Sequence, residues 1–328
     1  MIFTLAVTGP TASGKTALSL GLAEALSGEI ISCDSMQIYK YMDVGTAKAT
    51  PEEQKRAPHH MIDFLEPTET YSVEAYRASA VTLAEDITSR GRLPIFVGGT
   101  GLYLDSLLRA PQTDAPESDP EYRAKILSAI NDENDVQRLW DRLNEVDPAS
   151  AAEIHKNNIK RVIRALEIYD KTGVTKSELD RRSKTAARDV FVGMITLDFH
   201  NRETLYERVN LRVDIMMREG LFDEVRALYE RGMLRPDTTA AQAIGYKEIV
   251  EHLEGKCTLG EVVENIKLAS RRYAKRQLTW FRHCEGAVHL YCDDEDGRMR
   301  DGKDILAEAI AAFADFRRDF ENSNTTNI

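Results

Sequence analysis

Short apolar runs alternate with amphipathic stretches along the first hundred residues of the chain. Ile2 to Val7 is an apolar run that predicts a buried strand, and Thr16 to Leu26 follows with apolar side chains on one helical face. Glu29 to Ser32 and Leu93 to Val97 predict two more strands. This alternation is typical of a parallel sheet covered by helices, so we expect an α/β fold.

Glycine and serine residues mark helix ends in this region. Gly28 comes just after the first predicted helix, where a glycine suits the left-handed position past a helix end. Ser72 precedes a stretch whose apolar positions follow the 3.6-residue period until Gly91 interrupts it. We therefore predict a helix between these two residues, with Ser72 as its N-cap.

The pattern changes after residue 110. Three prolines lie in the segment from Pro111 to Pro120 and break any regular element there. Glu121 to about Asp189 is polar and helical in pattern, and Val190 to Leu197 returns to an apolar, strand-like run. We predict a helical insertion domain, residues 113–189, in an α/β core formed by residues 1–112 and 190–320.

The last third of the chain is expected to be mainly helical. Leu205 to Gly220 predicts a helix, and Val288 to Tyr291 is a last short apolar run. The polar segment Glu321 to Ile328 is expected to be a disordered tail.

Composition and charge bound the class of protein. The chain has 328 residues, of which 42% are hydrophobic, and it contains no run of about 20 apolar residues such as a membrane helix needs. Its four cysteines form no CxxC pair, which argues against a zinc site or a disulfide framework. We expect a cytoplasmic protein without a membrane partner. The net charge of -11 means that any RNA contact must use local basic patches.

A complete P-loop motif lies between the first predicted strand and helix. Gly9-Pro10-Thr11-Ala12-Ser13-Gly14-Lys15-Thr16 fits the pattern GxxxxGK[ST]. Its backbone amides and the helix N-terminus can hold a diphosphate, the Lys15 ammonium adds positive charge, and the Thr16 hydroxyl can ligate Mg²⁺. The motif alone predicts a phosphorylated ligand without saying which one.

Three further blocks surround this motif in the expected fold. Cys33 to Tyr39 follows the second predicted strand, Asp43 to Lys48 comes shortly afterwards, and Gly98 to Tyr103 follows the strand that ends at Val97. The first and last blocks therefore lie at carboxyl ends of predicted strands. An open parallel sheet places its ligand crevice at that edge.

The blocks GPTASGKT, DSMQIYK, DVGTAK and VGGTGLY, in this order, resemble those of the tRNA dimethylallyltransferase (tRNA isopentenyltransferase) family. Lys160 to Glu167, Gln242 to Glu248 and Lys275 to Arg282 resemble further family blocks, so the resemblance extends over roughly 270 residues. It implies a P-loop NTPase-like core. Eukaryotic members carry a C-terminal zinc finger, and the absence of its Cys/His pattern here indicates the bacterial type.

The resemblance implies a reaction and its catalytic groups. A dimethylallyl group would move from dimethylallyl diphosphate to the exocyclic N6 amine of the adenosine on the 3′ side of the tRNA anticodon, with release of diphosphate. Asp34, at a strand end facing the P-loop, is our candidate general base, with magnesium support or helix capping as the alternative. Arg208 lies four residues before Arg212 on one helical face, and it would bind the diphosphate or else remain a surface arginine. Thr16 would hold Mg²⁺.

The resemblance also assigns contacts with the tRNA anticodon stem-loop, and we expect a monomer whose channel through the core receives the flipped adenine. The assigned residues are Asp34, Ser35, Met36, Gln37, Thr100, Arg123, Lys160, Arg161, Val162, Ile163, Arg164, Gln242, Ala243, Ile244, Gly245, Tyr246 and Lys247. Independently, a predicted helix carries a cationic stripe with Tyr273 between its members: Lys267, Arg271 and Lys275, with Arg272 and Arg276 alongside. Either RNA binding or a solvated helix face explains this stripe.

Two other functions fit parts of the pattern. An ATP-dependent small-molecule kinase would need an acidic magnesium ligand after an apolar strand, and Asp63 or Asp198 could supply it. A non-catalytic RNA-binding protein could keep the P-loop as a nucleotide switch. The intact Lys15, Thr16 and Asp34 argue against that second alternative.

Overall fold

The computed structural model describes residues 1–110, 116–186 and 188–325. The chain forms two compact units, of which the first comprises Met1–Leu108 with Asp189–Ile328 and the second comprises Arg109–Arg188. The expected start of the insertion, Thr113, lies outside the described residues. No helix in the described ranges is both long and apolar enough to cross a membrane.

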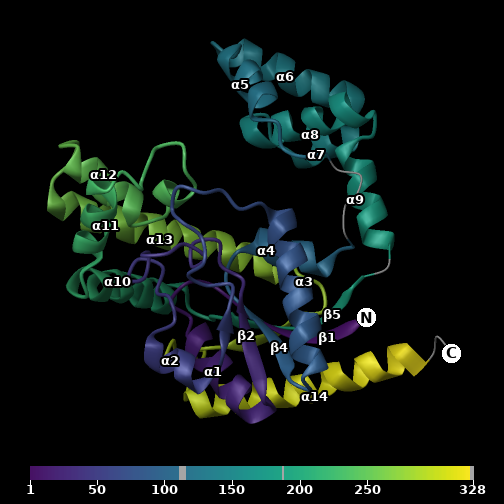
Figure 1. The fold of residues 1–328 in the computed structure, drawn as a ribbon, viewed down its shortest axis with the longest axis vertical. Coiled ribbons are helices and arrows are strands. Elements are labelled where there is room, and N and C mark those ends of the chain that lie inside the picture. Colours follow the sequence, from purple (N-terminus) through teal and green to yellow (C-terminus); the bar gives the residue numbers. More distant parts are fainter. Residues whose placement is uncertain (111–115, 187, 326–328) are drawn as a thin grey trace. The chain divides into compact units, whose positions relative to one another are not determined.

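A parallel sheet forms the centre of the first unit (Figure 1). Its six strands, in the described residues, lie in the order β3-β2-β4-β1-β5-β6, and every neighbouring pair is parallel. This arrangement confirms the predicted α/β class and its strands. The short strand β3 was not predicted, because two residues are too few to produce a hydrophobic pattern. The strands are β1 (Ile2–Thr8), β2 (Gly28–Ser32), β3 (His59–His60), β4 (Leu93–Val97), β5 (Val190–Asp198) and β6 (Val288–Tyr291).

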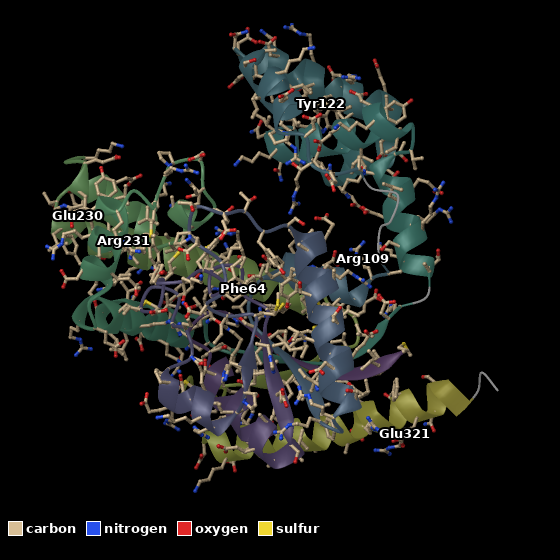
Figure 2. All side chains as sticks on the ribbon, in the orientation of Figure 1. Phe64, Arg109, Tyr122, Glu230, Arg231 and Glu321 are labelled. Carbon is tan, nitrogen blue, oxygen red and sulfur yellow. The ribbon has the colours of Figure 1, made fainter. Side chains whose placement is uncertain are left out.

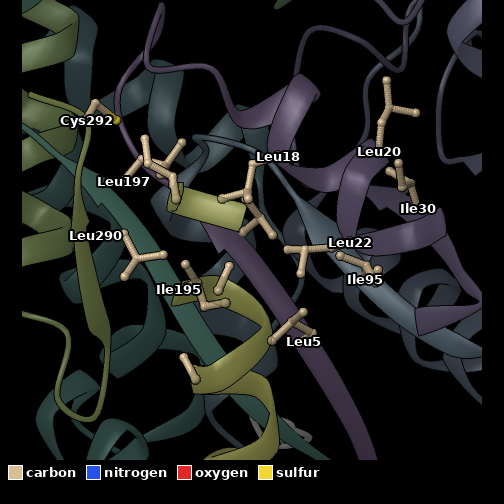
Figure 3. Close-up of a cluster of buried hydrophobic side chains, with 14 of the residues drawn as sticks. Leu5, Leu18, Leu20, Leu22, Ile30, Ile95, Ile195, Leu197, Leu290 and Cys292 are labelled. Atoms are coloured by element: carbon tan, nitrogen blue, oxygen red, sulfur yellow. The ribbon is translucent and has the colours of Figure 1, made fainter. Parts of the chain in front are cut away.

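Helices cover both faces of this sheet because successive strand residues point to opposite sides. Leu5 packs in one core, under α1 and α14, where Figure 3 shows it with Leu22 and Ile195. The next residue, Ala6, packs in the other core with side chains of α3 and α4. The helices of this unit are α1 (Lys15–Leu26), α2 (Pro51–Arg56), α3 (Val73–Ser89), α4 (Gly101–Leu108), α10 (Arg202–Arg218), α11 (Leu221–Glu230), η1 (Ala240–Gln242), α12 (Tyr246–Leu253), α13 (Leu259–Arg282) and α14 (Gly302–Thr325).

A third apolar cluster joins the segment after β2 to the C-terminal helices. Ile38 and Met42, from that segment, are 1% and 0% exposed. They pack with Val213 of α10, Val225 of α11 and Ile266 of α13. This packing holds the loop after β2 against α10 and α13, which form the other side of the cavity described below.

The predicted helix ends agree with the structure at one helix and differ at another. The Ser72 hydroxyl accepts a hydrogen bond from the Ala75 N–H and caps α3, as predicted. The prediction for Gly28 is wrong, because Ser27 is the left-handed residue that ends α1, with φ 52°, and Gly28 begins β2. A Cβ on Gly28 would lie 2.5 Å from Ile95 Cδ1. Close packing of β2 and β4 therefore explains this glycine.

The C-terminal segment is helical further than expected. Helix α14 continues to Thr325, so the described part of the expected tail, residues 321–325, is not disordered. The ring of Phe320 contacts Phe3 and Phe191 at centroid distances of 5.4 and 5.5 Å. Glu321, labelled in Figure 2, accepts a hydrogen bond from Arg317 one turn earlier. Residues 326–328 lie outside the described residues.

The second unit is helical, as its pattern predicted, and it has its own apolar core. Leu143, Val162 and Leu166 are at most 1% exposed in this core. Tyr122, labelled in Figure 2, donates a hydrogen bond of 2.6 Å from its hydroxyl to Asp170 Oδ2. The unit's helices are α5 (Pro120–Ser128), α6 (Glu133–Val146), α7 (Pro148–Glu153), α8 (Ile159–Thr172) and α9 (Lys176–Thr185).

Candidate active site

A cavity of about 400 Å³ lies in the first unit, at the carboxyl ends of three neighbouring strands. The P-loop follows β1, Asp34 follows β2, and Gly98 follows β4. All three segments line the cavity, together with residues of α10, α13 and the loop before α12. This is the edge where an open parallel sheet places its ligand crevice.

The P-loop backbone requires its glycines. Gly9 has φ +138°, and a Cβ there would lie 2.7 Å from the Leu197 carbonyl oxygen. Gly14 has φ +96° at the N-cap of α1. The Lys15 ammonium donates to the carbonyl oxygens of Gly9 and Pro10 at 3.0 and 2.7 Å. The loop therefore curves around the start of α1, where backbone amides and Lys15 can meet an anion.

Burial, and then the positive charge of Arg212, lower the pKa of Lys15 to about 7. Asp34 acts in the opposite direction and favours the charged ammonium. Burial likewise lowers the pKa of Arg212, and Asp34 again opposes that shift. Two cations and one carboxylate thus influence one another around the same cavity. A diphosphate bound here would favour the protonated form of both cations.

The hydroxyls of Thr16 and Ser13 in the P-loop could ligate Mg²⁺. Thr16 lines the cavity in the first turn of α1. Ser13 Oγ is buried and has no hydrogen-bond partner among the described residues. Hydroxyl oxygens are hard donors that suit this cation. Within residues 1–110, 116–186 and 188–325, no three His, Cys, Asp or Glu side chains gather into a metal site. A bound Mg²⁺ would therefore need further oxygen ligands from the diphosphate and from water.

The loop after β2 holds Asp34 on the cavity wall. Asp34 Oδ1 accepts a hydrogen bond of 2.9 Å from the Met36 N–H. The next residue, Ser35, donates its N–H to Thr100 Oγ1 at 3.1 Å. A Cβ on Gly98 would lie 2.0 Å from the Cys33 carbonyl oxygen, so only glycine permits this approach of the two loops. The loop after β4 thus supports the carboxylate of Asp34.

Gln37 serves to position another segment. Its Oε1 accepts from the Ser32 hydroxyl at 2.9 Å, and its Nε2 donates to the carbonyl oxygens of Thr46 and Ala47 at 3.2 Å. These bonds hold the DVGTAK segment, residues 43–48, against the end of β2. Both Gln37 and this segment line the cavity.

A carboxylate from α11 fixes the other end of the DVGTAK segment. The backbone N–H groups of Asp43, Val44 and Gly45 donate to the Glu224 carboxylate at 2.9, 2.8 and 3.2 Å. The Tyr246 hydroxyl donates to the same carboxylate. Three consecutive amides and one phenol thus share one anion, which joins residues 43–45 to α11 and α12.

The two arginines of α10 lie on different sides of the P-loop. Arg208 Nε donates to the Ala12 carbonyl oxygen at 2.9 Å, and its side chain lines a second cavity of about 480 Å³. Arg212 lines the first cavity instead. Ser13 and Gly14 line both cavities, so the P-loop forms a shared wall. Arg212 therefore shares a cavity with Asp34, whereas Arg208, which the family resemblance assigned to the diphosphate, contacts the P-loop from the second cavity. The diphosphate role of Arg208 stays a prediction.

Two residues of α13 complete the cavity, and our sequence analysis assigned neither a role there. Gln277 bonds to both the P-loop and Gly99. The Tyr273 hydroxyl lies 3.5 Å from the Gly99 carbonyl oxygen, and burial raises the pKa of this phenol. The KRQLTWFR block was the one signal for Gln277 in the sequence.

Comparison with known proteins agrees with this geometry. A family model described as IPP transferase matches residues 37–284, and another described as isopentenyl transferase matches residues 3–64. The chain belongs to the IPP transferase family. The tRNA dimethylallyltransferase of Halalkalibacterium halodurans is 47% identical over 292 residues, which are 89% of this chain and 92% of that protein. The one from Geobacillus kaustophilus is 49% identical over 278 residues, 84% and 86% of the two chains.

Solved structures of related proteins share the fold of this chain. The crystal structure of a full-length tRNA isopentenylpyrophosphate transferase from Bacillus halodurans has a TM-score of 0.73 at 40% identity and covers 99% of this chain and 100% of that one. A eukaryotic dimethylallyltransferase described as acting on tRNA has a TM-score of 0.74 at 31% identity, with 89% and 74% covered. These likenesses confirm the family resemblance and the P-loop NTPase-like fold.

The residues expected to contact RNA in the first unit of this IPP transferase differ in exposure. Asp34, Thr100 and the loop Gln242–Gly245 lie in or beside the cavity, and Gln242 and Lys247 are exposed. Ala243 and Tyr246 are 5% and 0% exposed, so they support the loop from inside.

The RNA candidates of the second unit also divide by burial. Val162 and Ile163 are each 1% exposed and face inward, so their side chains offer no surface to RNA. Arg123 and Arg164 both bond to the buried Glu167 carboxylate at 2.7 Å. The exposed residues of this set are Lys160 and Arg161.

The cationic stripe of α13 is only partly a solvated face. Lys267 Nζ lies 2.8 Å from Asp214 Oδ1, and Arg271 donates to Asn210 Oδ1 at 2.6 Å, both on α10. Arg276 lies 5.6 Å from the ring centre of Tyr273 and lines the cavity. Lys267, Arg271 and Arg276 therefore make contacts within the first unit.

Neither carboxylate that a kinase reading requires lies on the cavity wall. Asp63 accepts a hydrogen bond of 2.8 Å from Lys48. Asp198 ends β5, is 1% exposed, and binds the guanidinium of Arg282 through bonds of 2.9 and 2.6 Å. The cavity of this IPP transferase is bounded by Asp34 and the P-loop instead, which does not favour the kinase alternative.

Proposed function

We propose that this IPP transferase moves a dimethylallyl group from dimethylallyl diphosphate to the N6 amine of the adenosine on the 3′ side of the tRNA anticodon. The observation that carries the proposal is one cavity lined by the P-loop, the cations Lys15, Arg212 and Arg276, and the Asp34 carboxylate. Relatives named tRNA dimethylallyltransferase, which match this chain over most of their length, support the proposal.

Each group then has a defined part in the transfer. The N6 nitrogen forms a bond to C1 of the dimethylallyl group, while the C1–O bond breaks and its electron pair leaves with the diphosphate. Asp34 takes one proton from the attacking amine. Lys15, Arg212 and the P-loop amides stabilise the charge that develops on the leaving group. Mg²⁺, held through the Thr16 hydroxyl, would neutralise part of the same charge.

The RNA side of the proposal rests on the cavity rim and the second unit. The adenine would leave its stack to reach Asp34, as bases do in enzymes that modify them. Thr100 and the loop Gln242–Gly245 would meet the anticodon loop, and the exposed Lys160 and Arg161 would meet its phosphates. The lining of the cavity combines the P-loop, Asp34 and three cations without a residue from a second copy, and we propose a monomer that acts in the cytoplasm, where tRNA is found.

Transfer of radiolabelled dimethylallyl diphosphate to tRNA, with purified protein and Mg²⁺, tests this function. We expect label in tRNA that contains adenosine next to the anticodon and none in tRNA that carries another base there. A parallel assay measures phosphoryl transfer from ATP to small-molecule acceptors. Phosphoryl transfer from ATP without any label in tRNA would overturn the proposal in favour of a kinase.

A further inference from the structure

One side chain connects the two loops that this chemistry needs. Gln277 Oε1 accepts a hydrogen bond of 2.9 Å from the Thr11 N–H in the P-loop, and Gln277 Nε2 donates to the Gly99 carbonyl oxygen at 3.0 Å. The residue is 6% exposed. Its carboxamide thus bridges the loops that follow the adjacent strands β1 and β4.

The bridge requires one donor and one acceptor on the same planar group. A glutamate would lack the N–H that the Gly99 carbonyl oxygen accepts, and a methionine would lack both groups. The approach is also close, because a Cβ on Gly99 would lie 2.1 Å from Gln277 Nε2. On either side of Gln277, Ala274 and Phe281 are buried in the cores, and they hold α13 in place.

The bridge connects the diphosphate end of the cavity to its carboxylate end. Thr11 belongs to the loop that would hold the leaving group. Gly99 precedes Thr100, whose hydroxyl accepts the Ser35 N–H beside Asp34. Any change in the separation of these two loops would move Asp34 relative to the diphosphate. A misplacement of about 1 Å can reduce a rate by about 10²-fold.

We infer that Gln277 is a positioning residue that sets the P-loop and the Asp34 loop at the spacing required for group transfer. The inference rests on the proposed function. Gln277 acts through Thr11 and Gly99, so its loss should slow transfer while leaving the P-loop able to bind the donor.

The test compares full-length wild type, Gln277→Met and Gln137→Met. Gln137 is a matched control, because its amide also bridges two partners, Asp141 and Lys156, in the second unit. The measurements are single-turnover transfer to tRNA, the Kd for dimethylallyl diphosphate by calorimetry, and the melting temperature. For Gln277→Met we expect transfer about 10- to 100-fold slower, a Kd within about threefold of wild type and a folded protein. Gln137→Met should transfer at the wild-type rate.

A second variant gives a readout that a purely structural role would not change. A protonated Gln277→Glu side chain can donate to Gly99 and accept from Thr11, whereas the ionised form cannot donate. Its transfer rate relative to wild type should therefore rise as pH is lowered from 8 to 5.5. A ratio that does not change with pH, or a Gln277→Met variant as fast as wild type, would overturn the positioning role. Wild type that labels no tRNA would instead overturn the proposed function, and the inference with it.

Discussion

Individual side chains of this IPP transferase divide the work between binding and chemistry. Asp34 and Lys15 line one cavity, but in the proposed reaction the carboxylate takes a proton whereas the ammonium binds the diphosphate. Substitution of Asp34 should therefore change mainly the rate of transfer, whereas substitution of Lys15 should also change donor affinity.

Asp34→Asn removes the base and keeps the shape and the hydrogen-bond acceptor for the Met36 N–H. We expect kcat to fall by about 10²- to 10⁴-fold, because general-base removal typically costs that much. The Kd for dimethylallyl diphosphate should remain within a few fold of wild type. Single-turnover transfer and calorimetry measure the two quantities, and an unchanged kcat would remove Asp34 from its role.

Lys15→Ala should weaken binding as well as catalysis, because its ammonium meets charge in both the ground and transition states. Loss of one charge-assisted hydrogen bond predicts a Kd for dimethylallyl diphosphate about 10- to 100-fold higher. Calorimetry measures it, with the exposed Lys55→Ala as control. Equal donor affinity in wild type and Lys15→Ala would mean that the diphosphate lies elsewhere.

At this scale, the sequence predicted the P-loop and Asp34 because each follows a recognisable strand at the ligand edge. The resemblance assigned Arg208 to the diphosphate and gave Arg212 no role. Residues four apart share a helical face, and the sequence could not show that the P-loop passes α10 so that the two arginines line different cavities. Gln277 carries no spacing pattern at all, because its two partners lie far away along the chain.

Among the elements, the segment Asp43–Lys48 is held in place by a contact that its local sequence does not predict. Glu224 holds its first three amides from α11. The strands, in contrast, were predictable from apolar runs, because a parallel sheet buries both faces. The end of α14 was not predictable from the local sequence, because its residues are mostly polar. Phe320 instead packs against Phe3 and Phe191, which are distant in the chain.

Glu224→Gln should lower the free energy of unfolding by about 1–3 kcal/mol, because the new amide presents an N–H group where backbone N–H groups already point. Urea unfolding measures the change. Asp223→Asn is the control: its side chain is 71% exposed and pairs only with Arg226 in α11 among the contacts described, so a change within about 0.5 kcal/mol is expected. Equal effects of the two substitutions would contradict the anchoring role.

Across the whole first unit, the candidate active site and a buried ion-pair cluster lie at opposite ends of the strands. The cavity lies at the carboxyl ends, whereas Glu29 lies near the start of β2, where its side chain is 3% exposed and bonds to Arg90, Arg92 and His60. Hydrogen bonds from Arg90 contribute most to lowering the pKa of Glu29, to about 2.

The sign of the resulting pH dependence follows from that shift. The pKa of Glu29 is lower in the folded state than its unfolded value of 4.5, so its stabilisation is present above pH 4.5 and is lost as pH falls toward about 2. Glu29→Gln should lower the unfolding free energy by about 2 kcal/mol at pH 7, and the difference should shrink between pH 4.5 and pH 3. Urea unfolding at several pH values checks this, and a constant difference would contradict it.

The pairing of β1 with β5 also determines when the enzyme can become active during its synthesis. β1 carries the P-loop, yet its neighbour β5 begins at Val190, after the entire second unit, and α14 covers their shared face only from Gly302 onward. The second unit has its own core and can fold on the ribosome first. The P-loop strand β1 cannot pair with β5 until the second unit has been synthesised. Products truncated before α14 should leave Leu5 and Ile195 exposed and be recognised by chaperones.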